Sequence, residues 1–141
     1  DRKSRVRSHN KLADYSMTPF GQKIREMRAE KAVTLTEMAK SLQVSAAYLS
    51  ALEHGKRGKP SLVMLHQICQ YFNIIWEEAE ELQNCARLSV PRVVVDTIGL
   101  TPDATEFANL VAEHIGTFTE NEIESLLDYL KLKIQLNKGT E

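Results

Sequence analysis

The sequence has little cysteine, few aromatic residues and no long apolar run, and each of these shortages excludes a class of protein. Two cysteines among 141 residues, Cys69 and Cys85, are too few for a disulfide framework and indicate a reducing compartment. No apolar run approaches the roughly 20 residues that span a bilayer, and no secretory signal opens the chain. We therefore expect a cytoplasmic protein.

Motifs for catalysis and for metal binding are lacking as well. The sequence contains no nucleophile elbow, no glycine-rich phosphate loop and no convincing pair of catalytic acids. His66 and Cys69 stand three residues apart and could form half of a metal site, but no second pair follows at ligand spacing. We interpret Cys69 as a packed core residue. The sequence predicts neither an enzyme nor a bound cofactor or metal.

The charges are unevenly distributed along the chain, although the formal net charge is only −1. Residues 1–16 carry five basic and two acidic side chains, and residues 17–62 carry eight basic and four acidic ones. Residues 63–141 carry five basic and thirteen acidic side chains. A basic front half and an acidic rear half predict that a polyanionic partner binds the front half.

Residues 1–16 are polar and basic, and they show no hydrophobic periodicity. Met17 resembles a natural start. We expect residues 1–16 to be a disordered lead left by an expression vector. The alternative is a basic arm that tracks a DNA groove.

Between residues 17 and 86 the sequence predicts five short amphipathic helices. Thr18-Pro19 starts the first helix, and the capping box Thr34–Glu37 starts the second. Ser45 caps a third helix that Gly55 ends. The fourth helix is expected to bury one stripe of side chains, namely Leu62, Leu65, Ile68, Cys69 and Phe72. Trp76 is expected to begin an acidic fifth helix and to pack against the fourth.

The rear of the chain predicts one strand and two helices. "VPRVVVDTIGL" is rich in β-branched residues and predicts a strand over residues 90–98. Helix starts follow at Thr101-Pro102 and at the capping box Thr119–Glu122. A lone strand leaves its backbone groups unpaired, so we expect an antiparallel sheet between two subunits and a homodimer; the alternative is an extended arm packed in its own monomer. The predicted dimer interface consists of Val93, Val94, Val95, Ile98, Phe107, Val111, Ile123, Leu127 and Leu130.

The segment "TLTEMAKSLQVSAAYLSALEHGKRGKPSLVMLHQICQYFNI" resembles the phage-repressor-like, xenobiotic-response-element (XRE) family of bacterial regulators. The resemblance covers roughly residues 20–75 and includes Thr34, Tyr48-Leu49-Ser50, Gly55 and Pro60-Ser61. It implies that the third helix lies in the major groove, with its first turn at the base edges and the following basic loop on phosphates. It also implies an ion pair between Arg28 and Glu53. The residues expected to contact DNA are Thr34, Thr36, Ser45, Ala46, Ala47, Tyr48, Ser50, Ala51, His54, Lys56, Arg57 and Lys59.

Two features depart from the family pattern. Leu35 stands where the family usually has a glutamine that contacts DNA. Alanines at positions 46, 47 and 51 replace the long side chains that usually read bases. We expect the alanine methyls to pack on thymine methyls, while Ser45, Ser50 and Tyr48 supply hydrogen bonds and DNA shape supplies further discrimination.

These inferences predict a mainly α fold. A five-helix λ-repressor-like helix-turn-helix domain spans residues 17–86, and a strand-plus-two-helices dimerisation segment spans residues 87–141. The predicted function is a nucleoid-associated transcriptional regulator, most simply a repressor, that binds double-stranded DNA as a homodimer on a pseudo-palindromic operator. One alternative is the antitoxin of a toxin–antitoxin pair, which represses its own operon and holds a small protein toxin. The other is a protein-interaction adaptor that does not bind DNA.

Overall fold

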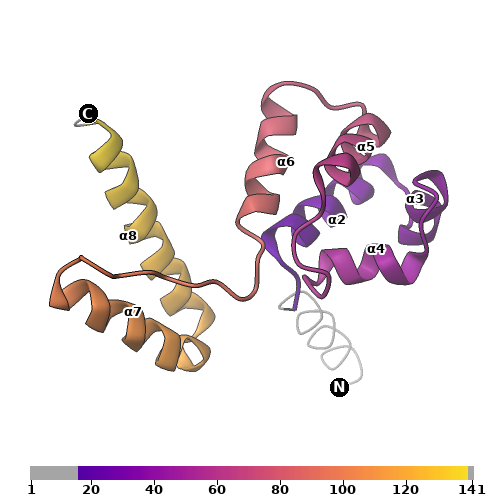
Figure 1. The fold of residues 1–141 in the computed structure, drawn as a ribbon. Coiled ribbons are helices and arrows are strands. Elements are labelled where there is room, and N and C mark those ends of the chain that lie inside the picture. The colour runs from indigo at the N-terminus through magenta and orange to yellow at the C-terminus, as the bar shows by residue number, and fades with distance from the viewer. Residues whose placement is uncertain (1–15, 140–141) are drawn as a thin grey trace, which may run out of the picture. The chain divides into compact units, whose positions relative to one another are not determined.

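A computed structural model describes residues 16–139, and the chain divides into two compact units between Val93 and Val94. The first unit contains helices α2 (Pro19–Lys31), α3 (Leu35–Ser41), α4 (Ala46–Glu53), α5 (Leu62–Phe72) and α6 (Glu77–Arg87) (Figure 1). The second contains α7 (Pro102–His114), the short 3₁₀ helix η1 (Ile115–Thr117) and α8 (Glu120–Gly139). The expectation of a disordered lead concerns residues 1–16, of which residues 1–15 lie outside the described residues.

Local side-chain caps begin most of these helices, as the sequence predicts. The hydroxyl of each capping residue accepts a hydrogen bond from the backbone N–H three residues further on, which satisfies a donor that the helix itself leaves unpaired. This geometry is found at Thr18, Thr34, Ser45, Ser61 and Thr101. At the start of α8 the capping box is complete, because Glu122 also accepts a hydrogen bond from the N–H of Thr119 at 2.9 Å.

The core of the first unit forms where α2 contacts α4 and α6, α3 contacts α4, and α5 contacts α6. Its buried side chains come from all five helices, at spacings that place them on one face of each. Cys69 packs against this core, which confirms its predicted role, and burial raises the pKa of its thiol above the ordinary value. The buried residues are Phe20, Ile24, Met38, Ala39, Leu49, Leu52, Met64, Leu65, Ile68, Leu82 and Ala86.

Two predicted core residues are instead exposed. The buried stripe of α5 runs through Met64, Leu65 and Ile68, and this stripe turns Leu62 outward, with 81% of its surface exposed. Trp76 is 82% exposed, so the prediction that it packs between helices is wrong. Ile74 packs against the core at this turn, and Trp76 follows with a positive φ of 56°.

The predicted strand over residues 90–98 is also wrong. A strand requires a ladder partner, and no segment among residues 16–139 forms one with it. The chain here is extended and exposed, with 96% of the surface of Val94 accessible. Local turns form at its end: the N–H of Ile98 donates to the Asp96 carboxylate, and the N–H of Leu100, just beyond the segment, donates to the Thr97 carbonyl oxygen.

The second unit has no buried residue in α7, η1 or α8. Its apolar side chains lie at helical spacing but are only partly covered. The first unit extends to Val93, and it includes Ser89 and Pro91, which contact the start of α2 and the turn at Gly55. Within residues 16–139 no helix has the length and apolarity needed to cross a membrane, and no three His, Cys, Asp or Glu side chains are grouped to hold a metal ion.

Candidate nucleic-acid interface

Helices α3 and α4 are joined by a tight turn that leaves one face of α4 outside the core. Gln43 adopts the left-handed conformation (φ 59°) in this turn, and Ser45 then caps α4. Leu49 and Leu52 of α4 are buried. The opposite face therefore projects away from the domain, as a helix that enters a DNA groove requires.

The outward face of α4 is small and polar. Ser45 and Ala47 are exposed, whereas Ala46, Ser50 and Ala51 are half-buried. No long side chain on this face holds the helix axis away from a partner. Of the predicted small readers, Ser45 and Ala47 are thus exposed, Ser50 and Ala51 are partly covered, and Ala46 packs partly against the core.

The starts of α3 and α4 both carry backbone N–H groups and a positive helix-dipole end. The hydroxyls of Thr34 and Ser45 already accept hydrogen bonds from Glu37 N–H and Tyr48 N–H. Thr36 is exposed in the first turn of α3, while Leu35 is partly buried against the core. Leu35 therefore contributes to packing, and Thr36 is the side chain of this turn that is free to meet a phosphate.

A basic loop, defined here as Lys56–Lys59, follows α4 directly. Gly55 and Gly58 have φ values of 73° and 71°, a conformation that favours glycine, and the N–H of Lys56 donates to the Ala51 carbonyl oxygen at 2.9 Å. Lys56, Arg57 and Lys59 are exposed. The turn therefore places three cationic side chains next to the end of α4, where phosphates flanking a groove would lie.

Two contacts at the end of α4 were not foreseen from the sequence, and the first of them connects α4 with this loop. The Arg57 guanidinium lies 5.6 Å from the centroid of the Tyr48 ring, a cation–π distance. The Nδ1 atom of His54 lies 2.8 Å from the Ser50 carbonyl oxygen, an acceptor, so Nδ1 carries the hydrogen. Tyr48 therefore holds Arg57 beside α4.

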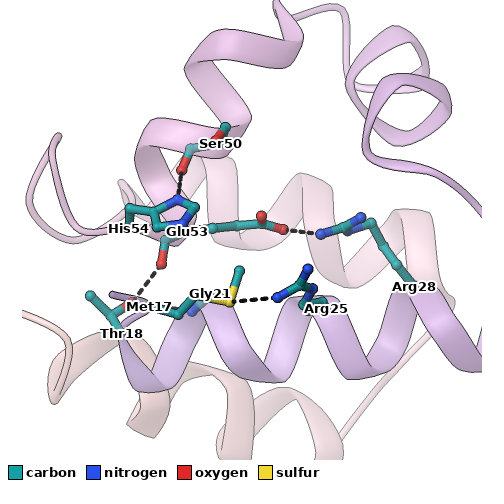
Figure 2. Close-up of polar contacts among 8 residues, drawn as sticks. All are labelled: Met17, Thr18, Gly21, Arg25, Arg28, Ser50, Glu53 and His54. Carbon is teal, nitrogen blue, oxygen red and sulfur yellow. Dashed lines mark hydrogen bonds and ion pairs between the residues drawn. The ribbon is translucent and has the colours of Figure 1, made fainter. Parts of the chain in front are cut away.

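An ion pair implied by the family resemblance ties α2 to the end of α4. Arg28 Nη2 lies 2.5 Å from Glu53 Oε1, and the two side chains are 12% and 3% exposed (Figure 2). Burial raises the pKa of Glu53 above its ordinary value, and the adjacent Arg28 charge opposes that rise. Arg28 Nε is buried and has no hydrogen-bond acceptor among the described residues. The pair thus fixes helix geometry while leaving one polar group unsatisfied.

The start of α2 is joined to the same end of α4. The N–H and the hydroxyl of Thr18 each donate to the Glu53 carbonyl oxygen at 3.2 Å (Figure 2). A Cβ atom on Gly21 would lie 1.9 Å from that oxygen, so the first turn of α2 approaches α4 more closely than any other residue would allow. These contacts set the position of α4 relative to the rest of the domain.

The predicted dimer residues lie on the extended segment and on the two helices of the second unit. Val93, Val94, Val95 and Ile98 are exposed on the extended segment. Phe107 on α7 is exposed, and Val111 is half-buried. On α8, Ile123 is half-buried, whereas Leu127 and Leu130 are exposed. They form no closed core within one chain.

Residues 21–79 match a family model described as a helix-turn-helix domain. The HTH-type transcriptional regulator RghRB of Bacillus subtilis (strain 168) is 33% identical over 61 residues, which cover 43% of this chain and 44% of RghRB. The HTH-type transcriptional repressor RghR of the same organism is 34% identical over 61 residues, which cover 43% of this chain and 45% of RghR. The chain thus spans less than half the length of these two relatives.

Two further matches extend beyond this domain. The HTH-type transcriptional regulator SinR of Bacillus licheniformis is 24% identical over 124 residues, which cover 84% of this chain and 98% of SinR. A solved structure titled as a SinR protein/SinI protein complex is 23% identical, with a TM-score of 0.39, and the match covers 82% of this chain and 98% of that chain.

Proposed function

We propose that this chain is an XRE-like helix-turn-helix transcriptional regulator that represses transcription by binding a pseudo-palindromic operator as a homodimer, a proposal that its similarity to HTH-type regulators supports. The observation that carries the operator-binding proposal is the junction of α4 and the basic loop. A capped helix with a small outward face is followed at once by Lys56, Arg57 and Lys59, and Tyr48 of that helix holds Arg57.

In the proposed complex, α4 lies in the major groove and the basic loop neutralises phosphates. Ala46, Ala47 and Ala51 bring methyl groups to the base edges, where thymine methyls are their natural contacts, and Ser45 and Ser50 supply hydrogen bonds. Sequence-dependent DNA shape adds discrimination, because small side chains allow close approach. Most of the affinity comes from phosphate contacts, so binding weakens steeply with salt.

The homodimer is proposed from the second unit. One helix-turn-helix domain contacts one half-site, and dimers of such domains read two half-sites about one helical turn apart. A unit of two helices without any buried residue is too small to sustain a core by itself. Packing the apolar sides of α7 and α8 against their copies in a second subunit buries them and supplies the two-fold symmetry that a pseudo-palindrome requires.

The alternative occupant of the α7–α8 surface is a small protein of another kind, as in an antitoxin. The same half-exposed side chains would then bind that partner. Sedimentation of the protein purified from native cells distinguishes the two: a homodimer has twice the chain mass, whereas an antitoxin co-purifies with a second small chain.

The DNA-binding proposal is tested by selecting bound duplexes from a random pool and measuring affinity against salt. We expect Lys56→Glu/Arg57→Glu to bind more weakly at low salt and to lower the slope of log K against log salt by about 4 for the dimer, because two phosphate contacts are lost in each subunit and each removes about 0.9 from that slope. The matched control is Arg87→Glu/Lys138→Glu, which makes the same charge change at exposed positions outside α4 and the basic loop. Equal loss of affinity in both variants would refute the proposed interface.

A further inference from the structure

Three segments far apart in the sequence meet at the base of the basic loop. They are the start of α2 at Thr18–Gly21, the end of α4 with its turn at Glu53–Gly55, and the segment that leaves α6, here called the exit segment, Ser89–Pro91. All three belong to the first unit. The exit segment was not predicted to have any role in the DNA-binding domain.

Ser89 joins the exit segment to the start of α2. Its hydroxyl accepts a hydrogen bond from the N–H of Phe20 at 2.8 Å and donates to the carbonyl oxygen of Cys85. Ser89 is 3% exposed, so neither bond is open to replacement by solvent. Thr18 caps the N–H of Gly21, and Ser89 caps that of Phe20, so α2 begins with two side-chain caps, one of them from a residue 69 positions away.

Pro91 joins the exit segment to the turn that begins the loop. A Cβ atom on Gly55 would lie 2.7 Å from Thr18 Cγ2 and 2.9 Å from Pro91 Cγ. Gly55 is therefore enclosed between the start of α2 and the Pro91 ring. Because Gly55 directly precedes Lys56, any displacement of these two walls changes the backbone conformation from which the basic loop departs.

We propose that Ser89 and Pro91 are positioning residues for DNA binding, which hold the base of the basic loop so that Lys56 and Arg57 face the phosphates. The inference rests on the proposed function of that loop. Neither residue touches DNA in this arrangement, and both act through Thr18 and Gly55. The exit segment is thereby part of the DNA-binding domain and not merely a connection to the second unit.

The test compares Ser89→Ala and Pro91→Ala with the unaltered full-length chain, on a duplex obtained by the selection described above. We expect each variant to weaken binding by about fivefold per subunit, the effect of losing one ordinary hydrogen bond or contact at the loop base. We also expect the salt slope of the dimer to fall by about 2, because one phosphate contact is lost in each subunit. Pro91→Ala removes an exposed ring, so it keeps the test valid if Ser89→Ala fails to fold.

The same substitutions are then made in a Lys56→Ala/Arg57→Ala background. If Ser89 and Pro91 act through the loop, they weaken binding no further there, since coupled residues are not additive. The control for general loss of stability is Ile68→Val, a fully buried change away from the junction. It lowers the melting temperature but leaves the salt slope of the folded protein unchanged.

Two results would overturn the inference. One is unchanged affinity and salt slope in both single variants. The other is a fold-change in affinity that is the same in the Lys56→Ala/Arg57→Ala background as in the unaltered chain. The proposed function fails differently. If Lys56→Ala/Arg57→Ala alone leaves affinity intact, the loop does not bind phosphate, and the positioning role falls with it.

Discussion

The buried pair Arg28–Glu53 yields the most quantitative prediction. Arg28→Met leaves the Glu53 carboxylate 3% exposed and without its counter-ion. Removing one partner of a buried pair costs about 3–5 kcal/mol, because an uncompensated charge stays in the interior. Replacing both partners, as Arg28→Met/Glu53→Leu, removes both desolvation penalties and the unsatisfied Nε of Arg28. We expect the double variant to be within about 1 kcal/mol of the original stability, or above it.

The cost of Arg28→Met also depends on pH. Burial already raises the pKa of Glu53 above its ordinary value of 4.5, and Arg28 opposes this rise. Without Arg28 the folded-state pKa rises further, so the folded protein binds a proton that the unfolded chain releases. Stability of the variant therefore falls as pH increases from about 4.5 through the folded-state pKa. The destabilisation is smaller at pH 5 than at pH 8.

Urea unfolding followed by circular dichroism measures these differences, with equal m-values confirming that the same surface unfolds in each variant. The original protein, Arg28→Met and Arg28→Met/Glu53→Leu are compared at pH 5 and at pH 8. A destabilisation of Arg28→Met below about 1 kcal/mol would show that the pair is effectively solvated. Equal destabilisation at the two pH values would show that the buried Glu53 carboxylate is not the cause.

Three further predictions follow from close contacts and exposed faces. Gly21→Ala should destabilise the protein by at least about 1–3 kcal/mol despite the better helix propensity of alanine, because its Cβ would lie 1.9 Å from a backbone oxygen of α4. Thermal melts measure this effect, and Gly116→Ala, whose Cβ would meet nothing within 4 Å, should be neutral in them. Leu130→Asp should convert the dimer to a monomer in sedimentation experiments. Leu132→Asp, equally exposed but on the other side of α8, should leave the dimer intact. If Leu132→Asp instead disrupts the dimer and Leu130→Asp does not, the interface lies on that other side. Ala47→Gln should change the sequence selected from random duplexes, and an unchanged selection would exclude direct reading by this face.

The helix-turn-helix domain was largely predictable because its signals are local. A capping hydroxyl acts on an amide three residues away, and helical spacing assigns a face without reference to other segments. The basic loop was predictable for the same reason, since its charges and its two glycines are adjacent in the chain. The family resemblance added the Arg28–Glu53 pair, whose partners are 25 residues apart.

The predictions that were wrong all depend on packing or pairing between segments, which a sequence pattern does not specify. β-Branched residues at 90–98 indicate a strand, but a strand exists only where another segment supplies its ladder. Trp76 is large and apolar, yet Ile74 packs at the turn and leaves it exposed. The size and hydrophobicity of a side chain indicate how much free energy its burial would contribute, but they do not indicate which of two neighbouring residues is buried.

The sequence by itself thus determined where helices begin, which faces are apolar and where positive charge gathers, because these depend on interactions within one or two helical turns. Only the tertiary structure decided that Ser89 caps α2, that Pro91 closes on Gly55 and that Arg57 lies over Tyr48. Such contacts join segments at separations along the chain that no sequence pattern predicts. They form because packing the apolar faces of five helices brings those segments together, and that packing is a property of the whole domain.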